Sequence, residues 1–255
     1  MKTITITIAN HKGGVAKSQT AIELAYCQAK KGKKVLVVDT DPQANTTDLL
    51  LAGNSPAGRC LPEILLDGDT IHSGDIMSRS FGGFSIDYVC NNIEASRIEQ
   101  RITTSPREFI LVKALREIKN DYDIIVIDTP PSAELLGLAA LIASDLILIP
   151  VTPDKPSIDG VESIMRVVQA VKNNEFFKSS ISVAGILITR YRFSLSTMKG
   201  KRNLIERYGS LVIDPPIREC TKVQQAVDNS RPVLDYDADC SAAKDYITAF
   251  DKLSL

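Results

Sequence analysis

The chain has 255 residues, of which 44% are hydrophobic and 24% are charged, and its formal net charge is −1. This length suffices for one large α/β domain over residues 1–255, but no apolar run approaches the roughly eighteen residues of a membrane-spanning helix, and any nucleic-acid affinity must come from a local basic patch. Its five cysteines lie at least twenty residues apart without a C-x-x-C pair, which predicts reduced thiols in the cytoplasm and neither a disulfide framework nor a zinc site.

The first predicted elements are a strand and a helix joined by a glycine-containing turn. Residues 3–9 alternate β-branched apolar residues with threonine, which predicts the strand, and apolar residues at helical spacing follow residues 10–18 (NHKGGVAKS). Glycines allow backbone N–H groups to surround phosphate oxygens, and a helix N-terminus adds partial positive charge. Here Lys17 would reach the outer phosphates and the Ser18 hydroxyl would ligate Mg²⁺. This stretch therefore predicts a nucleotide phosphate site.

The turn departs from the strict P-loop pattern G-x-x-x-x-G-K-[ST] at two positions. His11 stands in the place of the first glycine and Ala16 in the place of the second. The pattern K-G-G-x-x-K-[ST], with an additional Lys12 before the glycines, fits instead. Because Ala16 lies next to the helix start, we expect it to have a helical backbone conformation, which suits alanine.

Further along the chain, short apolar strands alternate with helical patterns, and no linker or repeat divides them. The predicted strands cover residues 33–39, 85–90, 123–128, 146–149 and 182–188, and the predicted helices cover residues 61–66, 106–119, 157–172, 196–208, 219–229 and 241–253. This alternation predicts an α/β fold with a doubly wound, mostly parallel sheet flanked by helices, with ligands at the carboxyl ends of the strands. The phosphate loop, Asp39 and Asp128 all fall at such ends.

Four segments, in order and spacing, resemble the ParA/MinD family of P-loop ATPases with a deviant Walker A box. They are residues 12–18, the switch segment 37–43, the Walker B strand with its following loop at 124–131, and the strand and loop at 148–160. The resemblance covers essentially the whole chain, and it is closest to small ParA proteins without an N-terminal helix-turn-helix extension. It implies an ATPase that uses ATP/ADP and Mg²⁺, with slow turnover stimulated by a partner.

The resemblance also implies roles for individual residues. Asp128 would bind Mg²⁺ through water, Asp39 would support the Mg²⁺ shell together with Ser18, and Asp41 would position the attacking water. Lys12, Lys17 and Asp41 are the expected catalytic residues, with Lys12 crossing a homodimer interface to the partner's nucleotide. The expected nucleotide-binding residues are Lys12, Gly13, Gly14, Val15, Ala16, Lys17, Ser18 and Gln19, with Thr189 and Pro216 near the adenine.

A basic stretch lies in the C-terminal third of the chain. Residues 190–222 hold eight Lys or Arg against three acids, a local charge of +5, so the remaining chain carries about −6. A chain that is neutral overall needs this asymmetry to contact DNA phosphates, and ParA relatives bind DNA without sequence preference through this region. The predicted DNA-binding residues are Arg190, Arg192, Lys199, Lys201, Arg202, Arg218 and Lys222.

The resemblance leads to one principal functional expectation and two alternatives. The first is partition of a plasmid, a chromosome region or a protein cargo by an ATP-dependent homodimer, associated with the nucleoid and stimulated by a ParB-like adaptor. A MinD-like membrane-positioning ATPase would need a basic amphipathic C-terminal helix, whereas residues 244–255 carry two Lys against two Asp. An iron–sulfur relative of the same fold would need paired cysteines, which the spacing does not provide.

Overall fold

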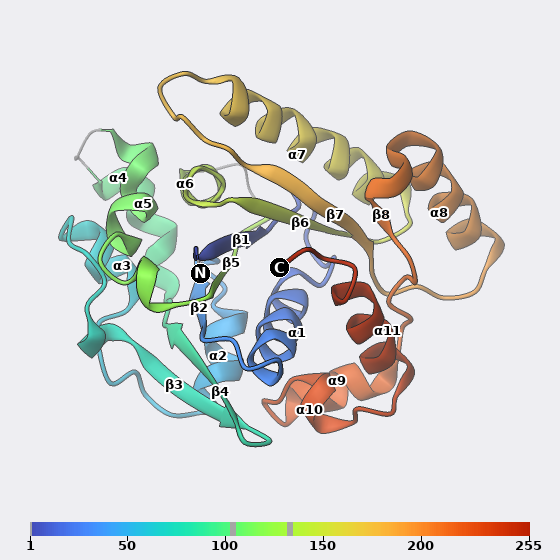
Figure 1. Cartoon of the computed structure of the whole chain (residues 1–255), viewed down its shortest axis with the longest axis horizontal. Helices are drawn as coiled ribbons and strands as arrows, with labels where there is room; N and C mark the ends of the chain where they lie inside the picture. The colour runs from blue at the N-terminus through green and yellow to red at the C-terminus, as the bar shows by residue number, and fades with distance from the viewer. Residues whose placement is uncertain (1, 103–105, 132–134) are drawn as a thin grey trace.

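The computed structural model describes residues 2–102, 106–131 and 135–255. Its centre is an eight-stranded sheet of order β3-β4-β2-β5-β1-β6-β7-β8 (Figure 1). The strands are β1 (Ile4–Ile8), β2 (Val35–Asp39), β3 (Met77–Phe81), β4 (Phe84–Val89), β5 (Ile124–Asp128), β6 (Leu146–Val151), β7 (Ser182–Ile188) and β8 (Val212–Ile213). Neighbouring strands are parallel except β3, which pairs antiparallel with β4. The predicted mostly parallel, doubly wound fold is confirmed.

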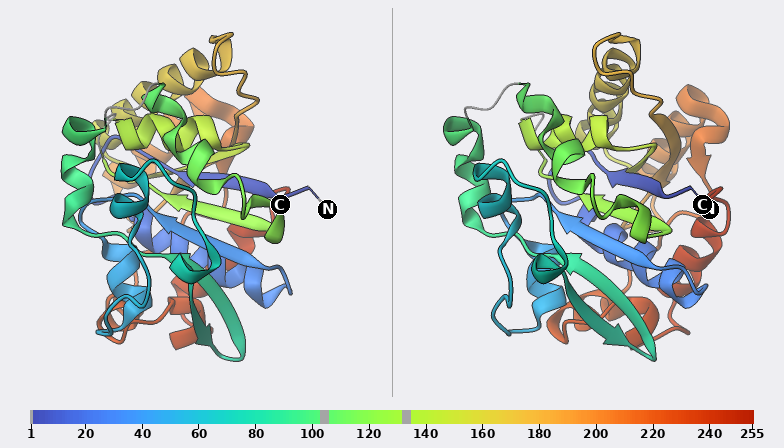
Figure 2. Two further views of the ribbon diagram at one scale, coloured as in Figure 1. Left: turned by 90° about the vertical axis from the view of Figure 1, so that its left-hand side faces the viewer. Right: turned by 60° about the vertical axis from the view of Figure 1, so that its left-hand side comes forward.

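The helices cover both faces of this sheet (Figure 2). They are α1 (Lys17–Lys30), α2 (Asn45–Leu51), α3 (Leu61–Leu66), α4 (Ile98–Arg101), α5 (Ile110–Leu115), α6 (Leu135–Ala143), α7 (Lys155–Asn173), α8 (Leu195–Tyr208), α9 (Thr221–Asp228), α10 (Val233–Tyr236) and α11 (Ser241–Phe250). Helices α1, α10 and α11 pack on one face, while α3, α5, α6 and α7 pack on the other. The central strands are therefore buried on both sides.

The sequence of β2 shows why the strands read as continuous apolar runs. Val35 and Val37 belong to the apolar cluster around α1, whereas Leu36 and Val38 belong to the opposite cluster with α3 and α5. Successive side chains of a strand point to opposite faces, so a sheet covered on both sides needs apolar residues at every position. The apolar run ends at Asp39, the last residue of β2, at the carboxyl end of the strand.

Most predicted elements are confirmed, with differences where the patterns are short. The six predicted strands correspond to β1, β2, β4, β5, β6 and β7, while β3 and β8 were not predicted. The helix expected over residues 106–119 is shorter, because a 3₁₀ turn precedes α5 and the α-helix ends at Leu115. Helices α2, α4, α6 and α10 were also not predicted. Among the described residues, no helix combines the length and apolar character needed to cross a membrane.

Candidate nucleotide site

The predicted phosphate loop connects the carboxyl end of β1 to the first turn of α1. Asn10, which is fully buried, fixes the start of the loop: its Nδ2 donates to the Pro150 carbonyl at 2.8 Å, and its Oδ1 accepts from the Lys12 N–H at 3.0 Å. Helix α7 approaches the same side chain so closely that a Cβ on Gly160 would lie 2.6 Å from Asn10 Oδ1. The loop is thus held by β6 and α7 as well as by its own neighbours.

Ala16 does not have the helical backbone conformation that we expected. Its φ is 63° and its ψ is 38°, in the left-handed region. This conformation directs the chain into α1, and the Ala16 carbonyl accepts from the Thr20 N–H at 2.9 Å and the Thr20 hydroxyl at 2.7 Å. A left-handed conformation costs an L-residue roughly 1–2 kcal/mol, which explains the glycine of the strict P-loop pattern at this position.

Lys17 is buried at the start of α1 and faces two acids. Only 7% of the residue is exposed, and its Nζ donates to the Lys12 carbonyl at 3.4 Å. Burial lowers the pKa of Lys17, whereas the charges of Asp128 and Asp41 act in the opposite direction. A partly desolvated ammonium at a helix N-terminus is well suited to bind phosphate oxygens.

Asp128, at the end of β5, offers one uncommitted oxygen to this site. Its Oδ2 accepts from the Thr46 hydroxyl at 2.8 Å and the Ser18 side chain also bonds to the carboxylate, but the buried Oδ1 has no hydrogen-bond partner. Burial raises the pKa of Asp128 to about 6. A buried carboxylate oxygen beside a hydroxyl is a donor set that fits Mg²⁺, so Asp128 and Ser18 are suited to hold this ion.

Asp39 lies beside Asp128 in the register of β2 and β5, but both of its oxygens are occupied. Its Oδ1 accepts from the Asp41 N–H at 3.0 Å, and its Oδ2 accepts from the Thr47 N–H at 2.9 Å and the Thr47 hydroxyl at 2.8 Å. Burial and the charge of Asp128 raise the pKa of Asp39 to about 8. Asp39 therefore orders the segment that carries Asp41, and that segment places the buried Asp41 carboxyl near Lys17.

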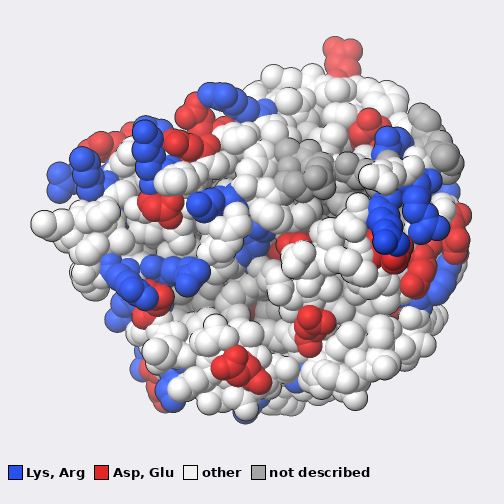
Figure 3. All heavy atoms as spheres, turned by 180° about the vertical axis from the view of Figure 1, so that it is seen from behind, with Lys and Arg blue, Asp and Glu red and all other residues white. Residues whose placement is uncertain are grey.

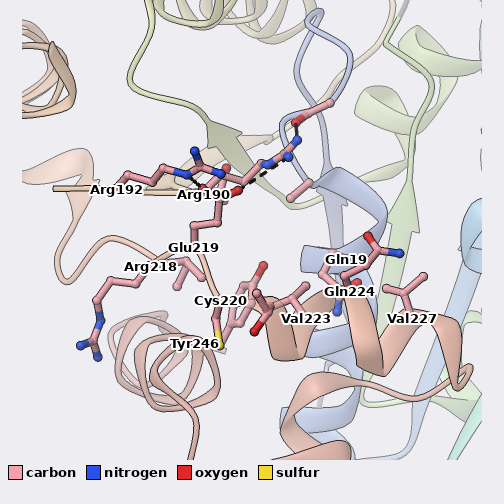
Figure 4. Close-up of a pocket in the computed structure, with 15 residues that line it drawn as sticks. Gln19, Arg190, Arg192, Arg218, Glu219, Cys220, Val223, Gln224, Val227 and Tyr246 are labelled. Atoms are coloured by element: carbon pink, nitrogen blue, oxygen red, sulfur yellow. Dashed lines mark hydrogen bonds and ion pairs between the residues drawn. The ribbon is translucent and has the colours of Figure 1, made fainter. Parts of the chain in front are cut away.

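A cavity of about 550 Å³ opens beside the phosphate loop (Figure 4). The loop side contributes Ala16 and Gln19, and α9 forms the opposite wall with Val223, Gln224 and Val227. The side-chain amides of Gln19 and Gln224 donate to Glu23 and Asp228 of their own helices, at 2.5 and 2.8 Å. The cavity volume falls in the range of small-ligand pockets, and apolar side chains with a few polar groups suit a nucleoside base.

The two residues expected near adenine lie differently with respect to this cavity. Thr189 lines it, and its hydroxyl donates to the Val15 carbonyl at 3.0 Å, so it also holds the phosphate loop. Pro216 is buried and is not among the lining residues, whereas the next residue, Ile217, is. The contribution of α9 was not predicted, because nothing in its polar pattern marks a base pocket about 200 residues after the loop.

The predicted DNA-binding residues do not form a single free surface. Arg190 donates to the Gly14 carbonyl at 3.2 Å, Arg192 pairs with Glu219, and Arg218 makes two 2.8 Å bonds to the Asp245 carboxylate. Lys201 lies 2.5 Å from Asp214, and Lys222 lies 3.8 Å from Asp237. Lys199 and Arg202, on α8, have no ion pair among the described residues. Figure 3 accordingly shows basic side chains interspersed with acidic ones.

Comparisons with known proteins agree with this geometry. The family described as "AAA domain" matches residues 1–183. The sporulation initiation inhibitor protein Soj of Bacillus subtilis is 31% identical over 95% of this chain and 94% of its own length. The chromosome partitioning protein ParA of Caulobacter vibrioides is 29% identical over 95% of this chain and 90% of its own length. A candidate plasmid partition protein from Borrelia burgdorferi, solved with AMPPNP, superposes with a TM-score of 0.81 at 25% identity and 98% coverage of both chains.

Proposed function

Because the chain belongs to the ParA/MinD family of ATPases, we propose that it binds ATP with Mg²⁺, dimerises around it and hydrolyses it to drive cargo partition or positioning. The observation that carries this proposal is that buried Lys17 lies within the electrostatic influence of buried Asp128, whose Oδ1 has no hydrogen-bond partner among the described residues. Phosphoryl transfer depends on positioning and on neutralising phosphate charge, and a cation for the phosphates and a carboxylate for a metal serve that purpose.

We assign a different role in ATP hydrolysis to each side chain of the site. Lys17 would bind the outer phosphates and the loop N–H groups would surround them. Asp128 and Ser18 would hold Mg²⁺, which would supply positive charge to neutralise the phosphates. Asp41, fixed through the Asp39 carboxylate and its own bond to the Gln43 N–H at 3.0 Å, orients the attacking water. None of these groups forms a bond to the phosphorus, so the rate depends on how well they are positioned.

We assign to Lys12 a contact with a second subunit. It is partly exposed and borders an open hollow of about 430 Å³ that Gly13, Asp154, Arg190 and Arg192 also line. In the proposed homodimer, this lysine contacts the partner's nucleotide, so the γ-phosphate links both subunits and its removal weakens the dimer. The relatives named as partition proteins support this switch as the basis of cargo movement.

Non-specific DNA and a ParB-like adaptor are the proposed partners. The uncommitted basic residues Lys199 and Arg202 of α8 are the first candidates for phosphate contacts, and duplication in a dimer would strengthen them. The MinD-like alternative is less well supported, because α11 buries Ala242, Tyr246 and Phe250 in the core. Its apolar face is therefore not available to lie on a membrane.

The proposal is tested by replacing Lys17, the buried cation of the loop. Lys17→Ala should abolish ATP-dependent dimerisation, because the outer phosphates lose their charge partner. Size-exclusion chromatography with light scattering, with ATP and Mg²⁺ present, measures the result. Lys30→Ala, at the exposed opposite end of the same helix, is the matched control and should dimerise normally. An undiminished dimer of Lys17→Ala would contradict the assignment.

A further inference from the structure

Two cysteines far apart in the sequence lie at the starts of two neighbouring helices. Cys220 is the N-cap residue of α9, and Cys240 is the N-cap residue of α11. The segment before α9 is tied to α11, because the Arg218 N–H donates to Asp245 of α11 at 3.0 Å and its guanidinium bonds to the same carboxylate. The Cys220 side chain accepts from the Ala242 N–H and bonds to the Cys240 thiol.

The two thiols have different surroundings. Burial acts to raise the pKa of Cys220, but hydrogen bonds from the Lys222 N–H, the Ser241 side chain and the Cys240 thiol hold it below the ordinary value. Burial raises the pKa of Cys240, and the nearby Cys220 adds to this rise. Cys220 thus forms the thiolate more readily than Cys240, which suits Cys220 as the attacking cysteine and Cys240 as the resolving one.

Cys220 can also be reached from outside. It is partly exposed and lines the 550 Å³ cavity together with Thr189, Val223 and Tyr246 (Figure 4). A second thiol pair, Cys60 and Cys90, provides the contrast, because these residues are only 5% and 0% exposed. Both belong to the apolar core cluster and neither lines that cavity. Of the two pairs, only Cys220–Cys240 opens onto a space that a small molecule could enter.

From this geometry we infer that Cys220 and Cys240 form a redox-active dithiol that reacts with small disulfides through the nucleotide cavity. The Cys220 thiolate attacks one sulfur of a disulfide such as oxidised glutathione, forming a mixed disulfide and releasing one thiolate, which takes up a proton. The Cys240 thiol then loses its proton and attacks the Cys220 sulfur, forming the Cys220–Cys240 disulfide and releasing the second thiol. Counted from the dithiol, including the proton that leaves Cys220 before the attack, the protein loses two electrons and two protons, and the small disulfide gains them.

This reaction competes with nucleotide for space. The mixed disulfide places a glutathione moiety in the cavity that the proposed function assigns to the base, so bound nucleotide should exclude it. This part of the inference rests on the proposed function, whereas formation of the disulfide does not. The finished disulfide links α9, which forms one wall, to α11, which is anchored in the core by Tyr246 and Phe250. Oxidation should therefore also raise the melting temperature.

The experiment uses the full chain, reduced, desalted and incubated with oxidised glutathione under native conditions. We expect two of the five thiols to be lost, peptide mapping to identify the Cys220–Cys240 link, and at least a tenfold slower reaction with saturating ADP and Mg²⁺. Cys240→Ser should stop at a stable mixed disulfide on Cys220. Cys220→Ser should not react, and Cys60→Ser, the matched control at the closed pair, should react like the parent chain.

The possible failures are distinguishable. Loss of no thiols, or a link between Cys60 and Cys90, would overturn the inference. ADP binding is measured separately by calorimetry on the reduced protein. If ADP binds but does not slow oxidation, the access route through the cavity is wrong. If ADP does not bind while the Cys220–Cys240 disulfide still forms, the dithiol stands and the proposed nucleotide function fails.

Discussion

At the scale of single residues, Ala16 shows a local conflict that the phosphate site imposes. The turn into α1 needs a left-handed backbone, but the residue there carries a Cβ. Ala44 and Ala52 have the same conformation, with φ of 52° and 51°, where the chain enters and leaves α2. Backbone strain of this kind persists only where surrounding hydrogen bonds fix it, and here the carbonyl bonds to Thr20 do so.

Replacing Ala16 with glycine should relieve this strain. In the folded state, glycine avoids the roughly 1–2 kcal/mol that the left-handed conformation costs alanine. In the unfolded state, glycine gives the chain more conformational entropy, which lowers the stability of the folded protein by about 0.4–1 kcal/mol. Ala16→Gly should therefore raise the free energy of unfolding by about 0.5–1 kcal/mol, measured by urea denaturation. Ala52→Gly, at the end of α2, is the matched control and should give a similar gain without changing nucleotide affinity. A destabilised Ala16→Gly variant would show that the strain estimate is wrong.

Asp41 permits a separation of binding from turnover. The residue is only 6% exposed and its carboxylate accepts from the Gln43 N–H, and we assign this carboxylate to the water and not to the phosphates. Asp41→Ala should retain ATP binding and dimerisation but lose most phosphate release, because the attacking water is no longer oriented. Phosphate release and light scattering measure the two properties, with Gln43→Ala, an exposed side chain of the same loop, as control. Normal phosphate release would reject the role, and loss of ATP binding would make Asp41 a structural residue.

At the scale of elements, a buried carboxylate joins α1 to α10. Glu23 is fully buried and accepts from the Val233 N–H at 2.6 Å and the Leu234 N–H at 3.1 Å, and the Gln19 amide donates to it. These bonds satisfy the free N–H groups at the start of α10. Since Gln19 also lines the nucleotide cavity, Glu23 fixes one wall of the pocket through its hydrogen bonds.

The pH dependence of stability should report this carboxylate. Burial raises the pKa of Glu23 from 4.5 to about 7, against the hydrogen bonds from α10, so the folded state binds more protons than the unfolded state between these values. The free energy of unfolding should therefore fall as pH rises from about 4.5 to 7 and level off above, with a contribution of at most about 3 kcal/mol. The Glu23→Gln variant lacks this contribution. Its free energy of unfolding, measured by urea denaturation, should therefore fall less between pH 4.5 and 7 than that of the parent protein. Parallel pH profiles of the two proteins would contradict the assigned pKa shift.

The elements that could be predicted from the sequence are those with a long or uninterrupted apolar pattern. Strands β2 and β5 are uninterrupted apolar runs, and the helical repeat of α7 is long enough to be recognised. Strand β8 has two residues and α10 has four, too few for a periodic pattern. The grouping of Lys17, Ser18 and Asp128 in the structure could be predicted because a local motif or a strand end marks each residue. The wall formed by α9 could not, because only the tertiary packing brings it to the loop.

At the scale of the whole molecule, ion pairs neutralise part of the +5 charge of residues 190–222. Arg218 is bound to the largely buried Asp245 and Arg192 to Glu219, so these side chains stabilise the wall of the cavity. The basic charge that has no ion pair among the described residues lies on α8, at Lys199, Arg202 and Arg207. We therefore expect α8 to contribute more to DNA affinity than the arginines beside the cavity.

Non-specific duplex binding should appear with ATP and not with ADP, because dimerisation brings together two copies of the α8 surface. Counterion release then makes the affinity fall by orders of magnitude, roughly 10-fold to 1,000-fold, between low and moderately high salt. Lys199→Ala and Arg202→Ala should weaken binding to two unrelated duplexes equally and flatten this salt dependence, as measured by fluorescence anisotropy. Hydrolysis without DNA should be unchanged, since neither side chain belongs to the phosphate site.

The matched control for this experiment is Arg116→Ala, which removes the same charge immediately after α5. Arg116 has a side chain that is 68% exposed and lies 3.8 Å from Glu117, so its loss should leave DNA affinity unaltered. An equal loss with Arg116→Ala would mean that net charge, and not the α8 surface, governs binding. If ATP-bound protein has no affinity for either duplex even at low salt, the DNA surface is refuted. Binding of that protein to anionic vesicles would then favour the membrane-positioning alternative, whose contact surface would have to lie outside the buried face of α11.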